Sequence, residues 1–417
     1  MKEEYLHYIF RTKQLGKYFT TTNNQKIEVL DFGIHNHNAG PDFLECKVRF
    51  DGKIWAGPIE FHVKSSDWIK HKHQFDSSYK NVIAHFVFEH DLEIMSGNYT
   101  LPAIEIKSLI NQNHFKKYDN YLNSKNWVSC QNEIKSCDDL IIYEQKEIAI
   151  RNRLTRKSQL VIDSIQKYNG DRKKAFVNLL FKAFGTKVNK SAFEILGEKF
   201  DWKIVSKLNH DSIKIQAYLF GLAGFLTGTN NDIFFILLKK EFSYLKTLFN
   251  LSEMNSEEWK FSAMRPFNLP TVRLAQLSQL LIDGLSVSDY ISLSELRPLL
   301  MSEMTGYWKK NYMFGRIGKK ENPGLTNSFV DLILINVFIP YYFAIGRLED
   351  NDILKEKSYN WLKSLNPENN SIIDKWKSLS INANSAFDSQ ALIEQKNEFC
   401  KMNLCLQCKV GSNLLNN

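Results

Sequence analysis

The chain has 417 residues, of which 43% are hydrophobic and 24% are charged, as in a soluble globular protein; this excludes a fully disordered chain. The length exceeds that of one ordinary core, so we expect two domains, or three. The net charge of +8 favours a polyanionic partner such as nucleic acid only slightly, because many proteins with no such partner carry as much.

The chain opens with MKEEYLHYIFRTKQLG, which predicts an amphipathic helix and not a signal peptide. The segment has neither the apolar core nor the small-residue cleavage site that a signal peptide needs. Six cysteines in such a chain argue against a disulfide framework. We therefore expect a cytoplasmic protein with no membrane partner.

The N-terminal part of the chain has the composition of β-strands. β-Branched and aromatic residues are concentrated in five segments, separated by clusters of Asn, Gly, Asp and Ser: 26–33, 43–50, 53–64, 81–90 and 101–106. The segment 81–90 is apolar on both faces, as is typical of a central strand covered on both sides. Strands that follow one helix and precede others predict an α/β sandwich.

Helical spacing of apolar residues begins near residue 138 and continues towards the C-terminus. The most apolar segment, 329–346, is interrupted by Asp331 and Pro340, so we expect a buried helix and not a membrane span. The predicted fold is α+β. An N-terminal mixed-sheet α/β sandwich in residues 1–115 is followed by a larger all-α domain in residues 116–417.

The segment GPDFLECKVRFDGKIWAGPIEFHVKSSDW, residues 40–68, carries a pattern with chemical content. Cleavage of a phosphodiester with Mg²⁺ or Mn²⁺ needs two converging carboxylates and a positive or proton-transferring group beside the attacking water. Asp42 opens one predicted strand. Glu60, His62 and Lys64 share one face of the next, because side chains alternate along a strand. Asp42 and Glu60 are the candidate cation ligands, and His62 or Lys64 is the candidate group near the water.

The register of this hairpin decides whether the two acids meet. The pair Asp51–Gly52 is a strong turn signal, and a two-residue loop there places Asp42 opposite Phe61, on the wrong face. A three-residue loop places Asp42 opposite His62 instead. Pro58 indicates a bulge or a sheet edge that resets the register, so the pattern permits a site without requiring one.

This stretch resembles the core of the PD-(D/E)XK, restriction-endonuclease-like nuclease superfamily, whose order is helix, strand, strand with Pro-Asp, strand with Glu-x-Lys, helix, strand. Pro41 and Asp42 match the Pro-Asp, and Glu60 matches the second acid. His62 stands in the place of the lysine, so Lys64 would have to substitute for it. The resemblance implies a metal-dependent nuclease acting on DNA or RNA, with Mg²⁺ or Mn²⁺ at the acid pair.

The whole chain resembles an uncharacterised bacterial family known only as a domain of unknown function. The shared features are GPDF, IEFHVKSSDW, YKNVIAHFV, RPFNLPTVRLAQL, GYW, NPENN and the terminal CLQC. This resemblance implies a common fold and no particular activity. The alternative function is therefore a non-catalytic nucleic-acid-binding or scaffold protein that keeps the nuclease fold, and the missing motif lysine favours it.

Histidines are concentrated near the two acids. Seven of the ten fall between residues 35 and 90: His35, His37, His62, His71, His73, His85 and His90. They can serve as metal ligands or proton-transfer groups, which leaves open a hydrolase that holds zinc in a histidine-rich loop. The alternative is structural, with packed strand residues at His85 and His90 and a solvated turn at His71 and His73.

Cys400, Cys405 and Cys408 lie close together near the C-terminus, with a spacing that lets a short loop wrap one metal ion. Zinc or an iron–sulfur cluster usually needs a fourth ligand, which Cys130 or Cys137 would supply. Some PD-(D/E)XK nucleases hold an iron–sulfur cluster with one upstream cysteine and three C-terminal ones, and this arrangement resembles theirs, although the spacing differs. The alternative is three ordinary thiols.

The segment GYWKKNYMFGRIGKK, residues 306–320, interleaves aromatic and basic residues. Cations neutralise phosphates and aromatic rings stack on unpaired bases, so this segment is a candidate contact for a single strand. The alternative is a packed segment whose aromatic side chains point inward and whose lysines point outward.

Overall fold

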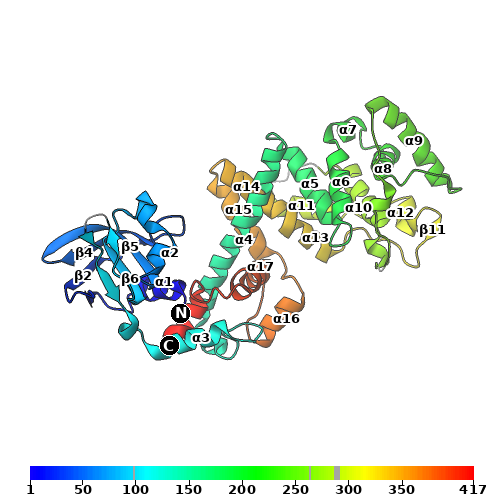
Figure 1. The fold of residues 1–417 in the computed structure, drawn as a ribbon. Helices are drawn as coiled ribbons and strands as arrows, with labels where there is room; N and C mark the ends of the chain where they lie inside the picture. Colours follow the sequence, from blue (N-terminus) through cyan, green and yellow to red (C-terminus); the bar gives the residue numbers. More distant parts are fainter. Residues whose placement is uncertain (97–98, 263, 286–291) are drawn as a thin grey trace. The chain divides into compact units, whose positions relative to one another are not determined.

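The computed structural model describes residues 1–96, 99–262, 264–285 and 292–417. The chain divides into two compact units, one formed by Met1–Ile142 with Phe399–Asn417 and the other by Tyr143–Glu398 (Figure 1). The first unit contains a mixed β-sheet, and the second is built mainly of helices. The predicted N-terminal mixed sheet followed by helices is confirmed.

The units do not divide at the predicted position between residues 115 and 116, and the C-terminal segment belongs to the first unit. Three helices account for this: α1 Glu3–Arg11, α3 Gln112–Leu122 and α18 Lys409–Asn416. The Tyr5 hydroxyl lies 2.7 Å from His114 Nδ1, and Lys117 Nζ donates to the Leu414 carbonyl at 2.6 Å. Leu415 is buried in the same core as α1. These contacts join segments distant in sequence, which is why helical periodicity alone does not group them.

The sheet of the first unit is mixed. Its strands stand in the order β1, β2, β4, β5, β6, β9, and β3 also pairs with β4. Neighbours from β1 to β5 are antiparallel, whereas β6 runs parallel to β5 and β9 parallel to β6. The bounds are β1 Tyr18–Thr20, β2 Lys26–Asp31, β3 Ile34–His35, β4 Phe43–Phe50, β5 Lys53–Lys64, β6 Ala84–Glu89 and β9 Ala103–Glu105, with β7 Met95–Ser96 and β8 Tyr99–Thr100 as a separate ladder.

The β4–β5 hairpin turns through two residues. Asp51 and Gly52 both have positive φ, at 48° and 74°, as a tight hairpin turn of this type requires. Phe50 pairs with Lys53 directly beyond them. The three-residue loop that the sequence also permitted is therefore wrong.

A bulge in β4 then resets the register of this hairpin. The pairing shifts by one residue between Phe43 and the rest of β4, where Glu45 has a φ of 60°. Pro58, which has no N–H to donate, is the residue of β5 opposite the bulge. The shifted register, carried one residue past Phe43, brings Asp42 opposite Glu60. Neither simple loop length provides this pairing.

Helix α1 covers one face of the sheet. Phe10 packs against Phe43, Phe61 and Phe86 of β4, β5 and β6, with ring centroids 4.9, 5.0 and 5.2 Å away. Side chains that alternate with these, among them Glu60, point to the opposite face. Three short segments contribute to that side of the unit: the helix α2 Asp67–Lys70 and the 3₁₀ turns η1 His73–Phe75 and η2 Ser77–Tyr79.

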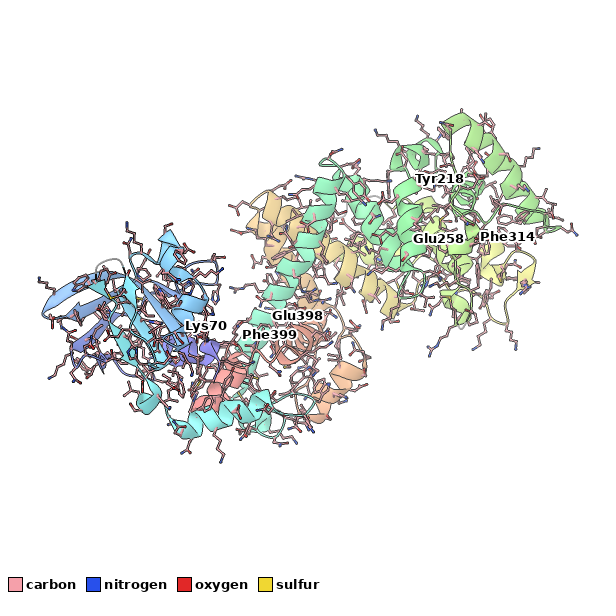
Figure 2. All side chains as sticks on the ribbon, in the orientation of Figure 1. Lys70, Tyr218, Glu258, Phe314, Glu398 and Phe399 are labelled. Atoms are coloured by element: carbon pink, nitrogen blue, oxygen red, sulfur yellow. The ribbon has the colours of Figure 1, made fainter. Side chains whose placement is uncertain are left out.

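The second unit holds most of the helices. Figure 2 shows Tyr218 and Phe314 among them, and the buried Tyr218 hydroxyl accepts the backbone N–H of Asp201 at 2.8 Å. The bounds are α4 Asp139–Lys167 (which begins in the first unit), α5 Arg172–Phe184, α6 Lys190–Lys199, α7 Trp202–Lys207, α8 Ser212–Leu222, α9 Ile233–Phe249, α10 Pro270–Ile282, α11 Leu293–Leu300, α12 Tyr307–Lys310, α13 Asn327–Ile333, α14 Ile339–Leu348, α15 Asp352–Ser364, α16 Ser371–Ser378 and α17 Ala386–Glu394, with a hairpin of β10 Asn311–Met313 and β11 Arg316–Ile317. The short turns are η3 Lys107–Leu109, η4 Ile134–Ser136, η5 Ser256–Glu258 and η6 Pro266–Asn268, with π-helical η7 Leu334–Phe338 and η8 Gln395–Cys400.

Helices α13 and α14 join through η7 into one apolar helix, Asn327–Leu348. Within the described part of the chain, this is the one helix long and apolar enough to cross a membrane by length and composition. Of its most apolar window, 78% is buried inside the protein, and the core helix of a globular protein passes the same test. Asp331 pairs with Arg297 at 2.5 Å. This burial agrees with the prediction of a buried helix.

Candidate active site

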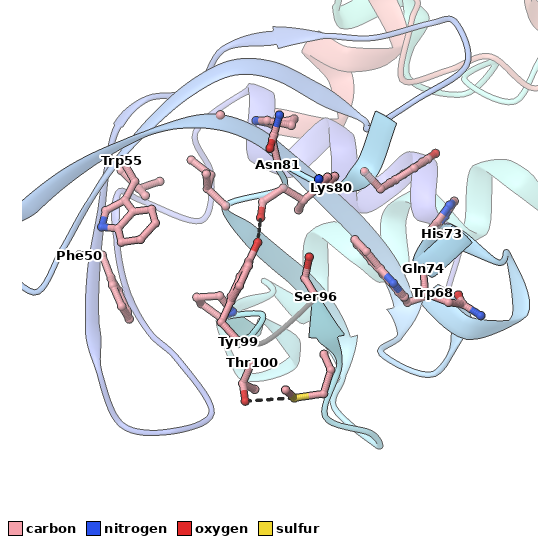
Figure 3. Close-up of a pocket in the computed structure, with 18 of the residues that line it drawn as sticks. Phe50, Trp55, Trp68, His73, Gln74, Lys80, Asn81, Ser96, Tyr99 and Thr100 are labelled. Atoms are coloured by element: carbon pink, nitrogen blue, oxygen red, sulfur yellow. Dashed lines mark hydrogen bonds between the residues drawn. The ribbon is translucent and has the colours of Figure 1, made fainter. Parts of the chain in front are cut away.

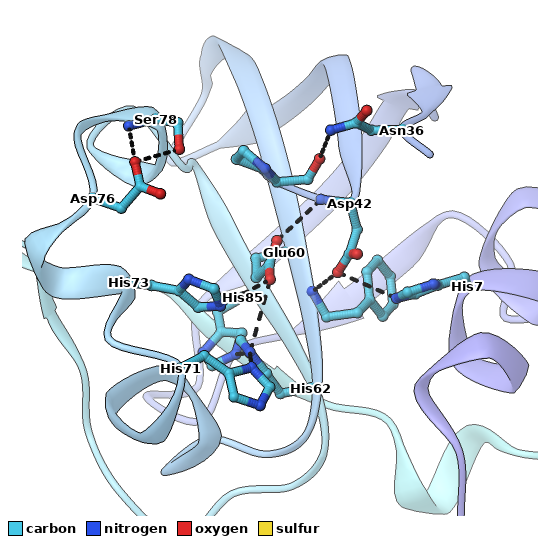
Figure 4. Close-up of polar contacts among 12 residues, drawn as sticks. His7, Asn36, Asp42, Glu60, His62, His71, His73, Asp76, Ser78 and His85 are labelled. Atoms are coloured by element: carbon cyan, nitrogen blue, oxygen red, sulfur yellow. Dashed lines mark hydrogen bonds and ion pairs between the residues drawn. The ribbon is translucent and has the colours of Figure 1, made fainter. Parts of the chain in front are cut away.

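Asp42 and Glu60 meet across the β4–β5 hairpin (Figure 4). The backbone N–H of Asp42 donates to Glu60 Oε2 at 3.0 Å, and the N–H of Phe61 donates to Asp42 Oδ2 at 2.9 Å. These two bonds hold each carboxyl group against the opposite strand, and the bulge at Glu45 brings the strands into this register. Glu60 is 4% exposed, so its carboxyl group lies where little water reaches it.

Two carboxylates so close together are unstable as a doubly charged pair. Burial, and after it the charge of Asp42, raises the pKa of Glu60 well above its usual range. At neutral pH the pair therefore retains a proton when no cation is bound. A divalent cation that binds both groups displaces that proton.

His62 lies two residues beyond Glu60 on the same face of β5 and belongs to a chain of imidazoles. Its Nδ1 lies 2.8 Å from His85 Nε2 on β6, and its Nε2 lies 3.1 Å from His71 Nδ1, directly after α2. Burial, and then the charges of neighbouring imidazoles, lowers the pKa of His62 to about 2 and that of His85 to about 3. Both rings are therefore neutral at physiological pH and offer lone pairs.

His73 adds a further imidazole from η1. Its Nε2 lies 3.5 Å from Glu60 Oε1, and His62 Nε2 lies 3.8 Å from the same oxygen. One ring nitrogen from each of His62, His71 and His73 lies within 4.8 Å of the others. The His73 ring stacks on Tyr79 with centroids 3.8 Å apart, which holds its plane. The HKH segment, for which the sequence left open a solvated turn, therefore borders the carboxyl pair.

Helix α1 adds two residues that sequence analysis missed. His7 Nε2 lies 3.2 Å from Asp42 Oδ2 (Figure 4). Burial, and then the charge of Asp42, raises the pKa of Glu3 above its usual range, so Glu3 also lies near the site. The available signal was their spacing of one helical turn at the polar edge of a helix that is otherwise buried.

Lys64, the second candidate for the motif lysine, lies at the exposed end of β5. Its backbone N–H donates to Asp67 Oδ2 at 2.9 Å. Among the described residues, no ion pair joins Lys64 to either acid of the pair. The groups nearest the acids are histidines.

A cleft of about 1310 Å³ opens beside the site. His73 and Trp68 lie at one end of it, and Trp55 and Phe50 lie at the other (Figure 3). Phe75 in the same lining is 83% exposed. The cleft therefore presents exposed aromatic rings next to His73, the residue of the site that lines it.

Four cysteines gather in the first unit from two distant parts of the chain. Cys130 precedes α4, whereas Cys400, Cys405 and Cys408 come from the end of η8 and the segment before α18. Burial raises the pKa of the Cys130 thiol, and the charges of the other three raise it further, which places them near it. No disulfide joins any of the six cysteines, all of which the structure describes. Cys130, and not Cys137, is thus the neighbour of the C-terminal three.

The aromatic residues of 306–320 are packed within the second unit. Trp308 is buried and stacks on Phe220 with ring centroids 4.7 Å apart. Tyr307 stacks on Phe234 at 4.3 Å. The faces of these rings are stacked against other aromatic side chains, as the packed alternative predicts. They therefore do not offer a platform for bases.

The fold and the site define a protein in which a mixed α/β unit with a carboxylate–imidazole site is followed by a helical unit. Residues 3–371 match the family model described as Protein of unknown function (DUF2851), and the chain belongs to that family. The predicted membership of a family of unknown function is confirmed. No curated protein and no solved structure matches the chain.

Proposed function

We propose that this protein is a metal-dependent phosphodiesterase that acts on DNA or RNA. The observation that carries the proposal is the pairing of Asp42 and Glu60 across the hairpin, beside neutral imidazoles. The order α1, β2, β4, β5, α2, β6, with β6 parallel to β5, supports the resemblance to the PD-(D/E)XK nuclease fold. Two carboxylates suit Mg²⁺ or Mn²⁺, which prefer oxygen ligands.

Asp42 and Glu60 would hold the cation in this mechanism. When bound, such a cation polarises a phosphate oxygen and lowers the pKa of a water molecule. His7, beside Asp42, is placed to accept the proton of the attacking water, because its side chain is 14% exposed whereas that of His62 is 1% exposed. Asp42, 3.2 Å from His7, then stabilises the charged ring.

The cleft that begins at His73 supports a nucleic-acid substrate with unpaired bases. Trp55, Phe75 and Tyr99 line it and are exposed, and rings of this kind stack on any base. The positive net charge of the chain acts in the same direction, because it attracts phosphates.

Cleavage assays with single-stranded and double-stranded DNA and RNA, in Mg²⁺, Mn²⁺ or EDTA, test the proposal. Glu60→Gln preserves the side-chain volume and removes the charge, and we expect it to lower the cleavage rate by ~100-fold or more. Glu93→Gln is the matched control, since Glu93 is exposed and lies outside the site. Cleavage that Glu60→Gln leaves unchanged would contradict the assignment of this site.

The alternative is a non-catalytic protein that binds nucleic acid or acts as a scaffold with the same fold. The exposed position of Lys64, away from the acids, favours it. Binding of single strands without cleavage in any of these metals, weakened by Trp55→Ala, would support this alternative.

We also propose that Cys130, Cys400, Cys405 and Cys408 hold a structural zinc ion or an iron–sulfur cluster. The electrostatic influence of the three C-terminal thiols on Cys130 supports this, because it requires the four to lie near one another. A site with four thiolate ligands has no open position, so its role would be stability and not catalysis.

A further inference from the structure

The imidazoles beside the acid pair form a second set of ligands. We propose that His62, His71 and His73, together with Glu60 Oε1, form a binding site for a first-row transition-metal ion, of which zinc is the best chemical fit. This centre differs in its ligands from a Mg²⁺ site at the acid pair. It goes beyond the proposed function, because it holds whether or not the protein cleaves nucleic acid.

The distances suit one ion after a small adjustment. His62 Nε2 lies 3.1 Å from His71 Nδ1, and Glu60 Oε1 lies 3.5 Å from His73 Nε2 and 3.8 Å from His62 Nε2. Ligand atoms ~2.1 Å from one zinc ion lie at most ~4.2 Å from each other. The three ring nitrogens are within 4.8 Å of one another, so side-chain rotation can close the set around an ion.

The two oxygens of Glu60 separate the histidine centre from the acid pair. Oε2 accepts the N–H of Asp42, whereas Oε1 faces the rings of His62 and His73. One carboxylate oxygen and three imidazole nitrogens are ligands that zinc takes in proteins. Mg²⁺ takes oxygen ligands, so it does not fit the histidine side.

His85 orients His62 for this role. Its Nε2 lies 2.8 Å from His62 Nδ1, and both rings are buried. A histidine that binds metal through one nitrogen usually has the other held by a hydrogen-bond partner, which selects the tautomer. His85 is therefore a positioning residue that leaves His62 Nε2 for the ion.

The backbone between His71 and His73 directs both rings to one point. Lys72, between them, has a φ of 62°, in the left-handed region that few residues other than glycine adopt. This turn brings both rings against His62, at centroid distances of 5.0 and 5.2 Å. Backbone strain of this kind is found at binding sites, where the surrounding structure holds it. His71 is exposed, so an ion has a route of entry.

Cobalt substitution tests the centre, because Co²⁺ occupies zinc sites and its visible absorption reports the ligands. Protein stripped of metal by a chelator is titrated with Co²⁺, and we expect saturable d–d absorption that Zn²⁺ abolishes and excess Mg²⁺ does not. Cobalt bound to the cysteines is distinguished by the thiolate charge-transfer band in the near ultraviolet.

The variants His71→Ala and His73→Ala separate the two kinds of site. Each should weaken Zn²⁺ binding at the histidine centre by more than ~100-fold and leave the thiolate band unchanged. His85→Gln should weaken Zn²⁺ binding at the histidine centre by ~10–100-fold. His71 is exposed, so its replacement leaves the core intact. His210→Ala, in the second unit, is the control and should match the parent protein.

Identical cobalt spectra in His71→Ala, His73→Ala and the parent would overturn the proposal. So would a parent spectrum that contains only cobalt bound to thiolates. Neither result depends on cleavage. If the protein binds cobalt at the histidine centre but cleaves no nucleic acid, the proposed function is contradicted and the proposal of the histidine centre stands.

Discussion

Glu60 is the residue that joins the acid pair to the histidines. Its Oε2 accepts the N–H of Asp42, and its Oε1 faces His62 and His73. Burial and the Asp42 charge raise its pKa, so the metal-free protein holds a proton at this point. Any cation that uses this carboxylate must therefore compete with a proton, and its affinity depends on pH.

The affinity of the acid pair for Mg²⁺ should rise with pH across the neutral range. The raised pKa of Glu60 means that binding releases a proton, which higher pH favours. Titration calorimetry in buffers of different ionisation enthalpy measures the protons released. Glu60→Gln should abolish the release, and Glu93→Gln should preserve it. An affinity independent of pH would mean that Glu60 is already ionised before the cation binds.

Metal-free protein should lose stability as the pH falls below the ordinary histidine pKa of 6.5. Burial depresses the pKa of His85 to about 3 in the native state. Between these values the unfolded chain binds a proton that the native state does not, so stability falls with decreasing pH, by up to ~1.4 kcal/mol per pH unit for one group. Denaturant titrations in EDTA at several pH values measure the slope.

His85→Gln should make this slope shallower, because the variant no longer carries the group that titrates only on unfolding. His210→Gln, which removes a histidine from the second unit, should keep the slope of the parent protein. Equal slopes in the parent and in His85→Gln would show that His85 binds a proton as readily in the native state as in the unfolded chain, which contradicts the depressed pKa.

At the scale of elements, the bulge in β4 determines the geometry of the acid pair. The turn at Asp51–Gly52 alone would place Asp42 opposite a residue on the wrong face. One extra residue in β4, with Glu45 in the left-handed region, shifts the pairing and moves Asp42 opposite Glu60. A local backbone irregularity therefore creates the contact on which the proposed chemistry depends.

Glu45→Gly should raise the free energy of unfolding by ~0.5–1 kcal/mol, because glycine adopts positive φ without a clash of its Cβ. Lys47→Gly is the matched control. Lys47 is exposed in the same strand with ordinary backbone angles, and its replacement should lower the free energy of unfolding by ~0.5–1 kcal/mol. Urea denaturation measures both. Destabilisation by Glu45→Gly as well would contradict the left-handed conformation at the bulge.

At the scale of the whole molecule, the two ends of the chain belong to one unit. The Tyr8 hydroxyl lies 2.9 Å from Ser412 Oγ, and Leu406 and Leu415 are buried in the core that α1 covers. The C-terminal cysteines lie in this same segment. A metal ion bound to them and to Cys130 would therefore tie the C-terminal segment to the body of the first unit.

Cys405→Ser/Cys408→Ser should remove near-stoichiometric zinc or iron from anaerobically purified protein and lower its melting temperature. Elemental analysis and calorimetry measure the two effects. Cys137→Ser is the control and should keep the metal, because Cys137 is not among the thiols that act on Cys130. Metal-free parent protein with the melting temperature of the double variant would leave these cysteines as ordinary thiols.

The order of strands and helices could be predicted from the sequence, because the signals for it are local. β-Branched and aromatic residues mark β4, β5 and β6, and Asp51–Gly52 marks the turn. Helical periodicity marks α4 and the apolar helix Asn327–Leu348. The candidate acids could also be predicted from the sequence, since Asp42 follows Pro41 at the start of one predicted strand and Glu60 lies in the next.

Which of these residues come into contact was decided by the tertiary structure. The bulge at Glu45 has no sequence signal beyond a proline on the opposite strand, so the register remained open. His7 and His73 reach the acids from segments packed over opposite sides of the sheet, and no local pattern encodes that approach. Cys130 and the C-terminal cysteines meet because long-range packing buries both segments in one core, and such packing depends on contacts between residues hundreds of positions apart.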